Sequence, residues 1–91
     1  MVKESIKKYL KEKGKFLIIG KNAYNVSKKL TALDKRGASI FDNVNELPKA
    51  AQQAFYSELR MPEKVVIGLI KKDMNLPNVI KEHCMILRLK E

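Results

Sequence analysis

The stretch Gly14-Lys15-Phe16-Leu17-Ile18-Ile19-Gly20-Lys21-Asn22 decides the fold that we predict for this chain. Its four consecutive apolar residues, Phe16 to Ile19, lie between turn-forming residues. An uninterrupted apolar run of this kind is typical of a strand that is buried on both faces. A helical pattern begins directly after it. The turn Gly20-Lys21-Asn22 would then present backbone N–H groups and the positive end of a helix, which suit an anion.

An amphipathic helix is expected before this strand. Apolar residues at helical spacing within residues 2–13, followed by Gly14 as the stop, predict it. A chain of 91 residues has room for one small core. We therefore expect a single domain, 1–91, in which the N-terminal amphipathic helix 1–13 packs on an α/β core formed by residues 15–91.

A second helix is expected after the strand, with Asn22 or Asn25 as its cap. Its apolar residues keep helical spacing, and Lys35 and Arg36 stand in its last turn before Gly37. Cations and a following glycine both suit the carboxyl end of a helix, so we expect this helix to end there.

Strands and helices continue to alternate along the rest of the chain. The expected strands are residues 38–41, 64–70 and 85–90, and the expected helices are residues 45–60 and 76–83. The last strand alternates apolar and basic residues, which indicates a half-exposed strand at the edge of a sheet. Alternation of this sort predicts an α/β domain with a mixed, partly parallel four-stranded sheet.

Two arrangements of these elements remain open. The one we favour is a two-layer sandwich, with both main helices on one face of the sheet. The alternative is a three-layer, doubly wound sheet that carries helices on both faces.

Positive charge is the main feature of the composition. The chain has 19 basic and 10 acidic residues, a formal net charge of +9. Residues 1–36 hold eleven of the basic residues and three of the acidic ones. A positive field concentrated in one third of a small domain attracts polyanions, of which nucleic acid is the commonest. The competing interpretation is that the lysines only keep the protein soluble.

Other classes of function find no support in the sequence. No apolar run approaches the ~20 residues of a membrane span, and the lone Cys84 cannot form an internal disulfide, so we expect a cytoplasmic protein. His83 and Cys84 are the only residues of their kinds, and the carboxylates are scattered. We therefore expect no metal, no cofactor and no catalytic residues, with Cys84 packed and His83 partly exposed.

The nucleic-acid contacts that we predict are seven basic residues and one asparagine: Lys15, Lys21, Asn22, Lys28, Lys29, Arg36, Lys49 and Arg60. Lysine is a point charge, and only three arginines occur, which favours contacts with the phosphate backbone of DNA or RNA over base recognition. Tyr24 and Tyr56 could stack on bases, but we favour half-buried core positions for both.

An alternative function comes from the doubly wound arrangement. In such a sheet, ligands bind at the carboxyl ends of the strands, here near Gly20 and Lys71. The chain would then bind a protein partner or a phosphorylated small ligand at the turn Gly20-Lys21. Neither G-x-G-x-x-G nor G-x-x-x-x-G-K-[ST] occurs, so no known nucleotide motif supports this interpretation.

Two segments resemble the Alba (Sac10b-type) archaeal nucleic-acid-binding family. Ile18-Ile19-Gly20-Lys21-Asn22 is similar to the strand, Ile-Gly-Lys-Lys turn and helix start of that family. The segment from Lys49-Ala50 to Arg60-Met61-Pro62-Glu63-Lys64-Val65 is similar to its Lys-Ala helix, which ends in Arg, Pro and a strand. The resemblance covers residues 15 to about 70. It implies a homodimer with a two-layer fold in which Lys21 contacts DNA or RNA.

Overall fold

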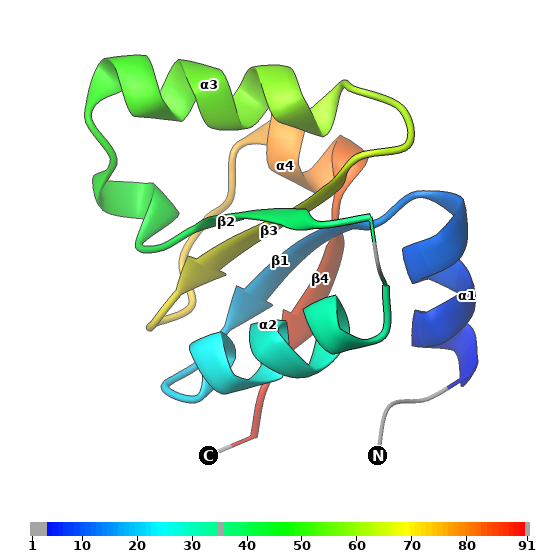
Figure 1. Ribbon diagram of the computed structural model, residues 1–91. Coiled ribbons are helices and arrows are strands. Elements are labelled where there is room, and N and C mark those ends of the chain that lie inside the picture. The colour runs from blue at the N-terminus through cyan, green and yellow to red at the C-terminus, as the bar shows by residue number, and fades with distance from the viewer. Residues whose placement is uncertain (1–3, 35, 91) are drawn as a thin grey trace.

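The computed structural model describes residues 4–34 and 36–90 (Figure 1). In chain order its elements are α1 Glu4–Glu12, β1 Lys15–Ile19, α2 Ala23–Ala32, β2 Ala38–Phe41, the 3-10 turn η1 Val44–Glu46, α3 Lys49–Leu59, β3 Val65–Ile70, α4 Asn78–His83 and β4 Met85–Arg88. The predicted α/β class and the predicted order of helices and strands are confirmed.

The four strands form one sheet in the order β2-β3-β1-β4, and every neighbouring pair is parallel. Phe16 of β1 stands opposite Ile67 of β3 on one side and Met85 of β4 on the other. The mixed sheet that we expected is therefore corrected to a parallel one. A helix stands between each strand and the next. Such a crossover brings the chain back to the end of the sheet at which the previous strand began, so the next strand runs parallel to it.

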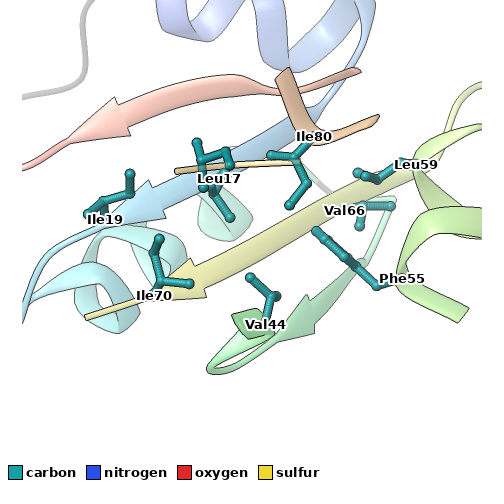
Figure 2. Packing of buried hydrophobic residues seen from close by; sticks show 9 residues of the cluster. Leu17, Ile19, Val44, Phe55, Leu59, Val66, Ile70 and Ile80 are labelled. Atoms are coloured by element: carbon teal, nitrogen blue, oxygen red, sulfur yellow. The ribbon is translucent and has the colours of Figure 1, made fainter. Parts of the chain in front are cut away.

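Helices cover both faces of the sheet. α1 and α2 lie on one side, and α3 and α4 lie on the other (Figure 1). On the α1/α2 face the buried core residues are Leu10, Phe16, Ile18, Ala23, Leu30, Val65, Ile67 and Leu69. On the opposite face they are Leu17, Ile19, Val44, Phe55, Leu59, Val66, Ile70, Leu76 and Ile80 (Figure 2).

Of the two arrangements that the sequence left open, the structure has the three-layer, doubly wound one and not the two-layer sandwich. The reason lies in β1 and β3, every residue of which is buried. Successive side chains of a strand point to opposite faces, so Phe16 and Leu17 need separate apolar layers. The two-layer fold that the resemblance to the Alba family implied is wrong for the same reason, because both faces of the sheet are covered by helices.

Packing is close where Phe55 of α3 meets β3. A Cβ atom placed on Gly68 would stand 2.8 Å from the Phe55 ring and 3.0 Å from Leu17 Cδ1. Glycine at this position thus lets the Phe55 ring rest on the strand itself.

The second helix ends earlier than predicted, at Ala32. Beyond it, an Asp34 carboxylate oxygen accepts a 2.8 Å hydrogen bond from the backbone N–H of Arg36. This local bond favours a turn over a further helical turn. Arg36 consequently lies in the turn before β2, while Lys35 lies outside the described residues. In the described part of the chain, no helix has the length and apolar character needed to cross a membrane.

Candidate functional site

The strand order creates a topological switch point between β1 and β3. These neighbours point the same way, but β1 leads into α2 on one face and β3 leads towards α4 on the other (Figure 1). Ligands of doubly wound proteins bind in the crevice that such diverging connections leave at the carboxyl ends of the strands. Here a crevice of about 80 Å³ is lined by Gly20, Lys21, Ala23, Tyr24, Asp42, Leu69, Ile70 and Lys71.

One flank of α2 borders this crevice. Ala23, Ser27 and Leu30 face the sheet, which leaves Tyr24 and Lys28 together on the flank beside them. The Lys28 ammonium nitrogen lies 5.0 Å from the centre of the Tyr24 ring. Tyr24 is 51% exposed, so the core position that we favoured for it is wrong, whereas Tyr56 is half-buried and packs on the core as expected.

Together these residues form what we call the switch-point surface: Lys21, Tyr24, Lys28, Lys71 and Lys72. All five side chains are exposed. Within residues 4–34 and 36–90, the ion pairs join Lys7, Lys8, Arg36, Lys64 and Arg88 to carboxylates, and none includes Lys28, Lys71 or Lys72. Asp42 is the acidic residue among those that line the crevice. The surface therefore carries a local excess of positive charge.

The basic residues at the opposite end of β1 make different contacts. We call this end of the sheet, around Lys15, Arg36 and Lys64, the amino edge. Lys15 is only 5% exposed, and its ammonium group donates hydrogen bonds to the carbonyl oxygens of Lys13, at 3.2 Å, and Lys64. Burial, with a smaller effect from the nearby charge of Arg36, lowers the pKa of Lys15 below its ordinary value. Lys15 thus joins the start of β1 to the segment before β3, and the predicted surface contact is corrected.

Arg36 has a similar structural role. Its guanidinium nitrogens lie 2.6 to 3.0 Å from the Asp34 carboxylate oxygens, and Nη2 also donates to the Leu10 carbonyl at 2.8 Å. Hydrogen bonding to Arg36 holds the pKa of Asp34 below its usual range. This contact ties the end of α1 to the turn before β2.

The remaining predicted contacts are distributed over the molecule. Lys21, Asn22 and Lys28 lie at or beside the switch point, but Lys29 lies on the other flank of α2, where it lines a groove with β4. Lys49 begins α3 and Arg60 follows it, both on the face that α2 does not cover. The structure therefore does not gather the eight predicted residues on one surface.

We did not predict that Lys72 belongs to this surface, and we predicted Lys71 only as part of the ligand site of the alternative function. A signal for both was present, since Lys71 and Lys72 directly follow the buried run of β3. The carboxyl ends of adjacent parallel strands meet at one edge, so basic residues after β1 and β3 come together there.

Cys84 lies in a cleft of about 690 Å³ at the amino edge, with Tyr9, Lys15 and His83 among its lining. Burial raises the pKa of the Cys84 thiol to about 12, which keeps the thiol protonated and unreactive at neutral pH. His83 is half-buried, with Nδ1 3.1 Å from the Val79 carbonyl oxygen. Cys84 is packed and His83 is partly exposed, as predicted.

Comparison with known proteins does not identify a relative: no family model, curated protein or solved structure matches the chain.

Proposed function

We propose that the protein binds nucleic acid through the phosphate backbone, at the switch-point surface. The observation that carries the proposal is the arrangement at the carboxyl ends of β1 and β3, where Lys21 and Lys71 line one crevice. Lys28 stands beside it over the Tyr24 ring. Lysine ammonium groups contact phosphates as point charges, and an exposed aromatic ring provides a face on which a base can stack.

The size of the crevice favours a chain of phosphates over an enclosed small molecule. Pockets for small ligands are roughly 300 to 1,000 Å³ and bury most of the ligand. The crevice measures about 80 Å³, which admits one phosphate group and leaves the rest of the ligand on the surface. A strand of nucleic acid meets this condition, because one phosphate can occupy the crevice while the neighbouring phosphates lie on the exposed surface beside it.

A phosphorylated small ligand is the second candidate, and the doubly wound topology favours it. The crevice lies at the switch point, where proteins of this architecture bind such ligands. Under this alternative a single phosphate group would bind at Gly20 and Lys21 with no further contact to Lys28 or Lys72. The two candidates therefore differ in which lysines matter and in the salt dependence of binding.

The test is a titration of labelled single- and double-stranded DNA and RNA, followed by fluorescence anisotropy at several salt concentrations. The double variant Lys21→Ala/Lys28→Ala should weaken binding nearly equally for all sequences and flatten the slope of log affinity against log salt by about one unit per lost contact. Lys49→Ala/Arg60→Ala removes the same charge from the α3 face and is the matched control.

Equal loss of affinity in both double variants would contradict the site, because the effect would then follow net charge alone. Binding of inorganic phosphate or a nucleoside monophosphate by the wild-type chain, without binding of oligonucleotides at low salt, would favour the small-ligand alternative.

A further inference from the structure

β4 leaves one side of its backbone without a neighbouring strand. It is the last strand in the sheet order and, in the described part of the chain, pairs with β1 alone. The N–H of Leu89, just past the strand, donates to the Ile19 carbonyl at 2.9 Å. Because backbone groups alternate in direction along a strand, the N–H and C=O groups of Ile86 and Arg88 point away from β1. These groups are positioned to pair with an added strand.

A groove of about 330 Å³ runs beside this open edge. Its lining joins three elements: Ile6 of α1, Val26, Lys29 and Leu30 of α2, and Ile86, Leu87, Arg88 and Leu89 at the end of the chain. Apolar side chains predominate, and the two charged residues, Lys29 and Arg88, are both basic. Within residues 4–34 and 36–90, the β4 edge thus combines backbone groups that face no strand, an apolar floor and a rim of two basic side chains, of which Arg88 is ion-paired with Asp73.

The charge of the groove indicates which kind of partner fits it. A second copy of this chain would bring a net charge of +9 to the same place, and its own groove would be lined by the same basic residues, Lys29 and Arg88. A carboxylate, in contrast, fits this rim, since Asp73 already binds Arg88 with an Oδ2–Nε distance of 2.8 Å. Nucleic acid presents no apolar side chains to the floor of the groove.

We propose that the β4 edge binds an extended segment of a partner protein in which apolar residues alternate with acidic ones. The segment adds a fifth strand through the outward backbone groups of Ile86 and Arg88. Its apolar side chains enter the groove over Leu87 and pack along the Lys29 side chain, while its carboxylates, which point to the other face of the sheet, replace Asp73 on Arg88. Backbone pairing supplies affinity, while the groove and its rim supply specificity.

This site is independent of the switch-point surface, because Lys28 and Lys29 lie on opposite flanks of α2. The pair provides a matched test. Lys29→Glu and Lys28→Glu change the net charge equally and alter adjacent exposed residues, so a circular dichroism spectrum should show both variants folded.

The probe is a short labelled peptide of alternating valine and glutamate, titrated with the full chain and followed by fluorescence anisotropy. Lys29→Glu places a carboxylate in the apolar groove and should weaken binding about tenfold, whereas Lys28→Glu, on the other flank of α2, should leave it almost unchanged. A peptide with lysine in place of glutamate, and one with backbone N-methyl groups along its pairing edge, should not bind. In a nitrogen-15 spectrum, the amide signals of Ile86 and Arg88 should shift on addition of the acidic peptide.

Four outcomes would overturn the proposal. The first is failure of the acidic peptide to bind the wild-type chain. The second is an equal effect of Lys28→Glu and Lys29→Glu, which would indicate attraction by net charge. The third is unchanged binding of the N-methylated peptide. The fourth is a dimer of the chain itself that Val26→Glu dissociates, which would assign the edge to a second copy. Loss of nucleic-acid binding in Lys28→Glu tests the proposed function separately.

Discussion

Lys15 and Lys21 stand at the two ends of the same short strand, yet the structure uses them in opposite ways. At the amino edge, Lys15 is buried and donates to backbone carbonyls. At the carboxyl ends of β1 and β3, which we call the carboxyl edge, Lys21 is exposed and lines the switch-point crevice. The number of basic residues around a strand therefore does not measure the charge that the strand offers to a ligand.

The same contrast extends to the residues around each end. At the amino edge, Arg36 forms an ion pair with Asp34, and Cys84 packs against the core. Lys71 and Lys72 at the carboxyl edge lie exposed after β3. We infer that the amino edge stabilises the fold and that the carboxyl edge binds the ligand, and the following predictions separate the two roles.

The largest expected effect is the pH dependence due to Cys84. Its pKa rises from an ordinary 9.0 to about 12 in the folded protein, so the folded state holds the proton more tightly than the unfolded state. The resulting stability is fully present below pH 9 and is lost as the pH rises towards 12, by up to about 1.4 kcal/mol per pH unit. Urea unfolding at several pH values measures it.

Cys84→Ala is the control for that prediction, because it removes this titration and should flatten the loss of stability above pH 9. Tyr9 remains in the variant, and its raised pKa acts in the same direction above pH 10. The decisive comparison is therefore between pH 9 and 10. Identical slopes for the two proteins in that range would show that Cys84 titrates as it does in the unfolded chain.

Lys15→Met should lower the free energy of unfolding by about 2 kcal/mol. The substitution keeps an unbranched side chain but leaves the carbonyls of Lys13 and Lys64 without their charged donor. Urea unfolding at pH 7 measures the change, with Lys21→Met, at the exposed end of β1, as a control expected to lie within about 0.5 kcal/mol of the wild type. Similar stabilities for the two variants would remove the distinction between the two ends of the strand.

Tyr24→Ala should weaken binding of single-stranded nucleic acid about tenfold, because a stacked base is worth roughly 1 to 3 kcal/mol. Tyr24→Phe keeps the ring and should bind almost as the wild type does. Anisotropy titrations of the two variants make the comparison. A loss of equal size in Tyr24→Phe would mean that the hydroxyl group, and not the ring face, contacts the ligand.

Arg36→Ala should cost about 1 kcal/mol of stability and leave the affinity for nucleic acid nearly unchanged. The guanidinium contacts Asp34 and the Leu10 carbonyl, and not the switch-point crevice. Thermal unfolding and an anisotropy titration on the same sample test both statements. Unchanged stability with weakened binding would move the nucleic-acid site towards the amino edge.

Much of the fold could be predicted because β1 and β3 are continuous apolar runs separated by helical patterns. Those runs also held the evidence for three layers, since residues such as Phe16 and Leu17 face opposite ways and both needed cover. The parallel direction of β4 was harder to predict. Its alternating residues indicate an edge strand equally well in either orientation.

The candidate site was only partly predictable. Lys21 follows from its place in the turn directly after β1, and Lys28 from its place on the first crossover helix. The position of Lys15 depends on the Lys64 carbonyl, which β3 brings close from 49 residues away in the chain and which no local pattern reveals. Tyr24 was misplaced because its exposure depends on the angle at which α2 rests on the sheet, with Ala23 and Ser27 turned inwards.

The most direct test of the central claim is a nitrogen-15 amide titration of the chain with a short oligonucleotide at low salt. We expect the largest shifts at Lys21, Tyr24, Lys71 and Lys72, with small ones at Lys13, Arg36 and Lys64. Shifts centred on the amino edge would contradict the account. So would a spectrum that the oligonucleotide leaves unchanged.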